Sequence, residues 1–147
     1  MSVKPIPQLY NLALEQFCRR VEMTFQPDCI ILHGSVAQGT DTPASDIDII
    51  VIGNQLPENF FERAFALNRL RDGSAPIEVI GYTPAEWEHM IDHLHLTVLE
   101  ALHWGRPLHG QALFDRWSAQ LAEWKSMGLR REETSWSIPL TLRHKIG

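Results

Sequence analysis

The sequence predicts an α/β fold in which helices pack on a small sheet. Two short runs, residues 29–33 and 46–52, are dominated by aliphatic and β-branched side chains, which is typical of buried strands. A third run of this kind, residues 76–82, follows a stretch with helical spacing. Helical segments precede, separate and follow the three runs, and such an order favours a sheet covered by helices.

The first half of the chain shows one clear helix before the first strand. Apolar residues between residues 8 and 25 recur at the spacing of a single helix face, and a Pro-Asp pair follows. Residues 34–45 are rich in Gly, Ser, Thr, Asp and Pro, which predicts a loop with at most a short helical turn. We expect a second helix over residues 56–71, because Pro57 and Glu58 suit its first turn.

The second half of the chain is predicted to be mainly helical. Thr83, Pro84 and Glu86 suit the N-cap, the first position and the third position of a helix, which together form a capping box. The helical pattern continues in one or two pieces to about Trp104, where Gly, Arg and Pro interrupt it. A further helix is expected over residues 111–127, and the pattern after it is weak.

The length and composition are those of one ordinary domain. The chain has 147 residues, of which 44% are hydrophobic and 21% charged. We expect a single domain over residues 1–147, with a core over about 9–82 and a helical C-terminal extension over about 84–147. The two cysteines, Cys18 and Cys29, have no metal or redox spacing, and we expect them to be buried reduced thiols.

The charge and the apolar runs limit the classes of partner. The formal net charge is −5, which argues against broad, sequence-independent binding to a nucleic-acid backbone. The longest apolar runs are too short to span a bilayer, and no apolar run follows a basic N-terminal stretch. We therefore expect no membrane association and a cytoplasmic location.

The residues with evident chemistry lie between 33 and 48. The first expected strand ends at Gly34, where a missing side chain lets a ligand approach the backbone. Ser35 offers a hydroxyl and an amide where a phosphate oxygen can bind. Asp46 and Asp48 lie two apart on the second strand, so both carboxylates point to one face. Crowded carboxylates favour a hard cation such as Mg²⁺, and a metal beside a phosphate site suits phosphoryl or nucleotidyl transfer.

This run resembles the signature of the DNA polymerase beta-like nucleotidyltransferase superfamily. The signature reads Gly-Ser, a spacer and Asp-x-Asp entering a strand, and it corresponds here to Gly34-Ser35, Gly39 and Ser45-Asp46-Ile47-Asp48. The likeness is greatest to small stand-alone bacterial domains, which include antitoxin-type proteins and relatives of the aminoglycoside nucleotidyltransferases. The resemblance implies a small mixed sheet with flanking helices and a helical C-terminal third. It also implies phosphate binding by Gly34, Ser35 and Ser45, and Mg²⁺ binding by the two Asp residues.

The resemblance further implies a third carboxylate on a neighbouring strand. In the family this residue is usually Asp, and it helps to hold the catalytic metal and can accept a proton from the attacking hydroxyl. The candidate is Glu78, which is the one acid within the apolar residues 76–80. Glu is one methylene longer than Asp, and Mg²⁺ tolerates little distortion of its octahedral coordination. The sequence therefore supports nucleotide binding more directly than catalytic turnover. The alternative is that Glu78 is an exposed acid on an edge strand.

Three functions are compatible with these residues. The first is an enzyme that uses Mg²⁺ and a nucleoside triphosphate, with ATP preferred, and transfers a nucleoside monophosphate to a hydroxyl of a protein, a small molecule or an RNA end. The second is an antitoxin-like binding module that contacts a toxin-like helical protein or another copy of itself, with weak or no catalysis. Its docking surface would be the apolar face of residues 111–127, where Trp117 and Trp124 pack inward or on a partner. The third is a nucleotide sensor.

Overall fold

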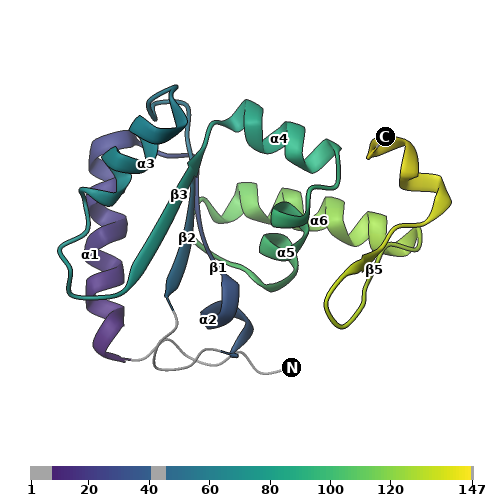
Figure 1. The fold of residues 1–147 in the computed structure, drawn as a ribbon, viewed down its shortest axis with the longest axis horizontal. Helices are drawn as coiled ribbons and strands as arrows, with labels where there is room; N and C mark the ends of the chain where they lie inside the picture. Colours follow the sequence, from purple (N-terminus) through teal and green to yellow (C-terminus); the bar gives the residue numbers. More distant parts are fainter. Residues whose placement is uncertain (1–7, 41–45, 147) are drawn as a thin grey trace.

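The computed structural model describes residues 8–40 and 46–146 and has the predicted α/β architecture (Figure 1). In chain order its elements are α1 (Gln8–Phe25), β1 (Cys29–His33), α2 (Gly34–Gln38), β2 (Ile47–Ile52), α3 (Phe60–Asn68), β3 (Ile77–Tyr82), α4 (Pro84–Asp92), α5 (Leu96–Trp104), β4 (Arg106–His109), α6 (Gln111–Ser126), β5 (Arg130–Arg131), β6 (Trp136–Ser137) and the 3₁₀ helix η1 (Leu140–Lys145). Among the helices of these residues, none is both long and apolar enough to cross a membrane.

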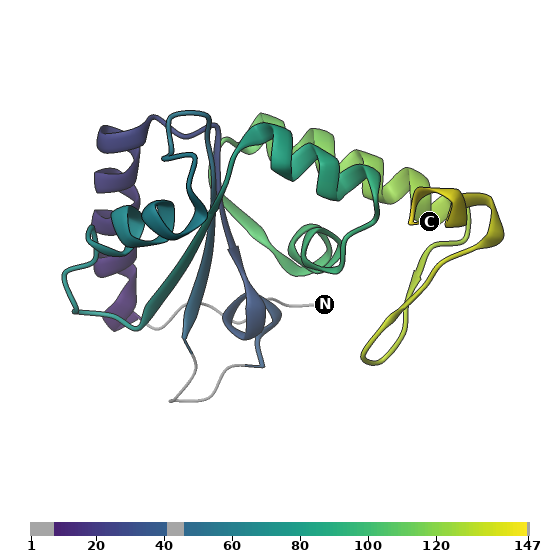
Figure 2. The same cartoon turned by 45° about the horizontal axis from the view of Figure 1, so that its top comes forward.

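Four strands form a mixed sheet in the order β3-β2-β1-β4, which confirms the implied fold class. β1 is antiparallel to β2 and to β4, whereas β2 and β3 are parallel. Figure 2 shows α1 and α3 on one side of this sheet and α4, α5 and α6 on the other. The register places Asp48 opposite His33 on one neighbouring strand and opposite Glu78 on the other.

The alternation of side chains along β2 divides the core into two clusters. Ile47 and Ile49 are buried against the α1 and α3 side, while Ile50 and Ile52 are buried against the helices of the other side. Because the period of a strand is two, Asp48 lies on the face of Ile50, where it is only partly buried.

The C-terminal helix α6 belongs to the core of the protein. Trp117 and Trp124 are buried in the same cluster as Ile31 and Ile50 of the sheet, and Trp117 contacts Trp87 of α4 at a ring-centroid distance of 5.7 Å. The expectation that the apolar face of residues 111–127 forms a docking surface is therefore wrong. This face is used to cover the sheet, as amphipathic helices usually are.

Two boundaries differ from the sequence-based expectation. α3 begins at Phe60 rather than near residue 56, because Asn59 is its N-cap and accepts hydrogen bonds from the amides of Phe61 and Glu62. The segment after Trp104 was expected only to interrupt a helix, but it forms the edge strand β4. Pro107 is tolerated there because an edge strand needs hydrogen bonds on one side only.

The segment after α6 is held against α5. β5 and β6 form a small hairpin, and Arg131 makes a two-pronged ion pair with Glu100 at distances of 2.9 and 3.0 Å. The indole N–H of Trp136 donates to the same carboxylate at 3.2 Å. The weak sequence pattern of this region is therefore compatible with a docked structure, because this ion pair and a few separate apolar residues, Leu129, Trp136 and Leu142, attach it to the core.

A buried arginine joins α3 to the sheet and to α4. Arg63 is 1% exposed, and its guanidinium donates to the carbonyls of Pro57, Glu58 and Gly81 and to the carboxylate of Glu86. The same Glu86 side chain closes the predicted capping box of α4. This network sets the position of α3 beside the edge strand β3, which borders the site described next.

Candidate nucleotide and metal site

The carboxylate of Asp48 lies directly against Gly34. A Cβ atom at position 34 would stand 2.1 Å from Oδ2 of Asp48, and Gly34 has a φ of +76°, in the left-handed region. Glycine is therefore required here for two reasons, space and backbone conformation. The sequence suggested that the missing side chain admits a ligand, whereas the structure shows that it makes room for a carboxylate of the site.

The short helix α2 begins at Gly34, so Ser35 directly follows the residue that contacts this carboxylate. Val36 and Ala37 are buried and anchor α2 on the sheet, so that Ser35 stays in the first turn next to Gly34. Gly39 ends the helix in a left-handed conformation and donates its amide to the carbonyls of Ser35 and Val36. The phosphate-binding candidates Gly34 and Ser35 therefore lie at the same end of the sheet as Asp48, while Ser45 lies outside the described residues.

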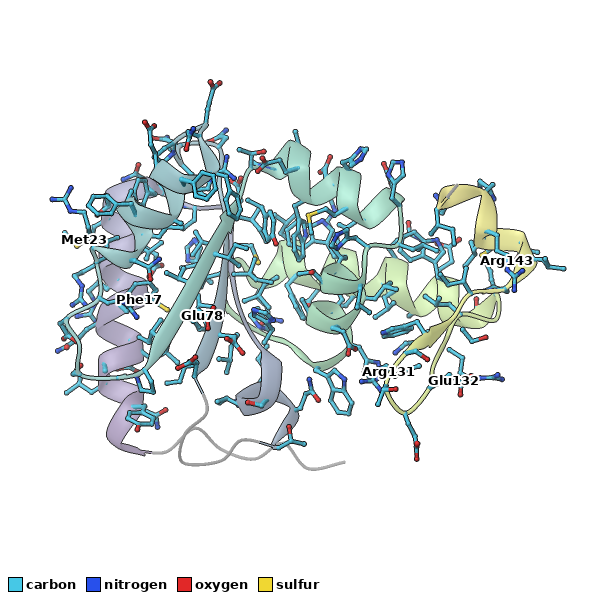
Figure 3. The ribbon with its side chains drawn as sticks, viewed as in Figure 1. Phe17, Met23, Glu78, Arg131, Glu132 and Arg143 are labelled. Carbon is cyan, nitrogen blue, oxygen red and sulfur yellow. The ribbon has the colours of Figure 1, made fainter. Side chains whose placement is uncertain are left out.

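Three carboxylates gather at this end of the sheet. Asp48 and Glu78 are register neighbours on the parallel strands β2 and β3. Asp46 lies directly before β2, and its charge acts on Asp48. Figure 3 shows Glu78 on β3, at the end of the sheet near α2. Asp46 and Glu78 are exposed and Asp48 is partly buried. Burial raises the pKa of Asp48 to about 6, and the charges of Glu78 and Asp46 contribute to this rise.

The chemistry of these donors fits a hard divalent cation. All three side chains offer carboxylate oxygens, and the raised pKa of Asp48 reflects in part a local excess of negative charge that a cation would relieve. Within the described residues, no three His, Cys, Asp or Glu side chains form a ready-made metal cage. Mg²⁺ is usually held by one or two carboxylates and completes its shell with phosphate oxygens and water.

The structure adds two residues that sequence analysis did not assign to the site. His33 and Thr97 line a pocket of about 360 Å³ together with Asp48 and Glu78. Burial lowers the pKa of His33 to about 4, so its imidazole is neutral at physiological pH and contributes no charge. The position of His33 directly before Gly34-Ser35 is a signal that could have identified it. Thr97 comes from α5, far along the chain, and no local pattern marks it.

The burial of Asp48 among other carboxylates predicts a stabilising substitution. In metal-free protein, Asp48→Asn should raise the free energy of unfolding near neutral pH by about 1–2 kcal/mol, allowing for partial exposure of the group. Because the folded pKa of about 6 exceeds the ordinary value of 3.8, the charge of Asp48 destabilises the fold progressively as the pH rises between these values. Thermal unfolding in the presence of a chelator should show that Asp48→Asn is more stable than the wild-type protein at about pH 7.5 and about equally stable at about pH 4. An equal change at both pH values would contradict this assignment.

Comparison with known proteins identifies the family of the chain. Residues 12–93, more than half of the chain, match the family model described as Nucleotidyltransferase domain. A Methanocaldococcus jannaschii protein named Putative protein adenylyltransferase MJ1305 is 36% identical over 58 residues, which cover 38% of this chain and 40% of the relative. The matched region thus spans about two fifths of the length of that curated relative.

Two solved structures share the fold. A chain from a toxin-antitoxin crystal structure with AMP-PNP has a TM-score of 0.52 and 21% identity, covering 77% of this chain and 87% of that chain. A chain from a mutant of the toxin-antitoxin MntA-HpeT has a TM-score of 0.53 and 19% identity, covering 78% and 86%. At these identities the likeness concerns the fold alone, and the family assignment depends on the matched residues 12–93. Together with the carboxylates beside Gly34-Ser35, that match shows that the chain belongs to the nucleotidyltransferase domain family, a family of transferases.

Proposed function

We propose that this protein is a magnesium-dependent nucleotidyltransferase that takes ATP and transfers AMP to a hydroxyl group of an acceptor. The observation that carries the proposal is the placement of Asp48 against Gly34 and beside Glu78, at the start of α2. The choice of ATP is supported by the Methanocaldococcus jannaschii relative, which is named an adenylyltransferase, and by the structural neighbour that was crystallised with AMP-PNP.

Different residues of the site would have different roles in the reaction. Asp46 and Asp48 would hold Mg²⁺, which supplies charge stabilisation for the triphosphate when bound. Ser35 and the backbone at Gly34 would orient the phosphates through a hydroxyl and amides. Glu78 would complete the carboxylate set and accept the proton of the acceptor hydroxyl, as the acceptor oxygen bonds to the α-phosphorus and pyrophosphate leaves.

The metal ligands can be tested by titration calorimetry with Mg-ATP. Asp46→Asn and Asp48→Asn should each abolish magnesium-dependent ATP binding without unfolding the protein, because each removes a carboxylate from the candidate metal site. Glu132→Gln is the matched control, since this acid lies in the C-terminal hairpin, well separated from Glu78 in Figure 3. Unchanged Mg-ATP affinity in both Asp variants would refute the metal site.

A binding module of the same fold is the second candidate. It is favoured by three exposed phenylalanines on α3, described below, and by the fact that both structural neighbours come from toxin-antitoxin crystal structures. A labelled-ATP assay with candidate acceptors separates the two functions: an enzyme transfers label in a Glu78-dependent manner, whereas a module binds its partner and leaves the acceptors unlabelled.

A further inference from the structure

The pocket that contains the carboxylates continues into a second groove along α3 and α4. Phe60 and Tyr82 line both spaces, so the two are adjacent. The second groove measures about 500 Å³ and extends over Ala85 and Met90 of α4. If one part of a ligand lies in this groove, the adjacent part of the ligand would therefore reach Asp48 and Glu78.

Next to this groove, α3 carries an exposed aromatic patch formed by Phe60, which lines the groove, and by Phe61 and Phe65, which follow it on the same helix. Their side chains are 45%, 81% and 67% exposed, respectively, although α3 is only nine residues long. Phe60 and Phe61 are packed edge to face at 5.9 Å, and Phe65 lies one turn from Phe61 on the same helix face. A contiguous apolar patch beside a functional pocket is a mark of an interaction site, because exposure of such side chains has a hydration cost.

Backbone carbonyl groups near both ends of the edge strand β3 are already hydrogen-bonded, so they are not free to pair with an added strand. On its outer edge, the carbonyl of Gly81 accepts a hydrogen bond from Arg63, and the carbonyl of Ile77 accepts one from Arg71. Side chains from α3 and the segment after it thus protect the edge, a common device against unwanted strand pairing. A partner is therefore expected to contact the aromatic side chains of α3 rather than to extend the sheet.

The charges around the groove indicate the chemistry of the partner. Among the described residues that line the two pockets, the acids are Asp48, Glu78 and Glu86, with no Lys or Arg. Glu58 and Glu62 are exposed at the start of α3, and Arg63 is buried and bound to Glu86 and three carbonyls. Arg69 is exposed and already lies over the ring of Phe65 at 5.7 Å. A phosphate backbone would find no Lys or Arg in this lining, while an apolar segment with basic residues would complement both the phenylalanines and the acids.

We propose that the groove between α3 and α4, with the aromatic patch of Phe60, Phe61 and Phe65, docks an apolar and basic polypeptide segment of the acceptor. The inference rests on the proposed function, because it assigns the acceptor side of that same site. Docking of the segment in the groove presents a Ser, Thr or Tyr hydroxyl of the acceptor to the carboxylates. The aromatic patch supplies affinity and the acidic border supplies orientation.

Three sets of synthetic peptides of equal length test this docking surface. Each peptide carries a central Tyr, with flanks of Leu and Arg, Leu and Glu, or Ser and Arg, and binding is followed by fluorescence anisotropy with Mg²⁺ and AMP-PNP present. The Leu-Arg set should bind about tenfold more tightly than either other set. The double variant Phe61→Ser, Phe65→Ser should remove this preference, since both side chains are exposed and their loss leaves the core intact.

The control is the double variant Leu12→Ser, Met23→Ser on α1, whose side chains are 63% and 73% exposed, and it should keep the preference. Equal binding of the three peptide sets, or a preference that survives in the Phe variant, would overturn the docking surface. Tighter, patch-dependent binding of a single-stranded RNA oligonucleotide would overturn it as well. Failure of the wild-type protein to bind Mg²⁺ with AMP-PNP would instead refute the proposed function, so the two failures are distinguishable.

Discussion

Glu78→Gln is expected to lower the rate of AMP transfer by about 10²–10⁴-fold, because a positioned general base alone contributes this much. Nucleotide should still bind, since Asp46, Asp48 and Ser35 remain. The prediction follows from the register of β2 and β3, which places Glu78 directly beside Asp48. The measurements are transfer of label from labelled ATP to an acceptor and calorimetric Mg-ATP binding on the same variant. Loss of transfer together with intact binding is the expected pair of results.

Glu78→Asp makes this test sharper. This substitution introduces the residue that the family usually has at this position. The rate of transfer should be kept or rise if the position on the strand sets the geometry of the site. It should fall if the site is adapted to the longer Glu side chain. Glu88→Gln, an exposed acid on α4, is the control and should leave transfer unchanged. Full activity in Glu78→Gln would exclude Glu78 as base and ligand. Absence of transfer in the wild-type protein with every acceptor would instead favour the binding-module function.

Arg63→Met should lower the free energy of unfolding by about 3 kcal/mol, because removal of one partner from a buried ionic network leaves buried acceptors unpaired. The carbonyls of Pro57, Glu58 and Gly81 and the carboxylate of Glu86 would all lose a donor. For a chain of this size the corresponding fall in melting temperature is roughly 6–12 °C. Thermal and urea unfolding of the purified variant measure the loss.

Arg69→Met is the matched control for this prediction. Arg69 is exposed on the same stretch of chain and lies over the ring of Phe65 at 5.7 Å, so its loss should change stability by less than about 0.5 kcal/mol. Gly81→Ala should act in the same direction as Arg63→Met, because a Cβ there would stand 2.9 Å from Cδ of Arg63 and 2.7 Å from Leu67. A loss below about 1 kcal/mol in Arg63→Met would mean that water replaces the guanidinium.

The local sequence pattern was sufficient to predict most of the elements and the first part of the site. The helices and the first three strands have side-chain periodicities of their own, and the Thr83–Glu86 capping box is determined by side chains three residues apart. Alternation along a strand is a local property, so the sequence could predict that Asp46 and Asp48 share a face. The buried α6 could be located along the chain, but periodicity alone could not show whether its apolar face meets the sheet or a partner.

The sequence by itself therefore determined the α/β class, the positions of the main helices and strands, and the prediction that Gly34 and Asp48 belong to one site, which the contact between them supports. Only the tertiary structure decided that residues after Trp104 form β4, that Arg63 is buried, and that Thr97 lines the pocket of the carboxylates. Each of these depends on contacts between segments far apart in the chain, which local periodicity does not encode. β4 exists because β1 offers it an unpaired edge, and Arg63 can be buried because carbonyls from two other segments converge on its guanidinium.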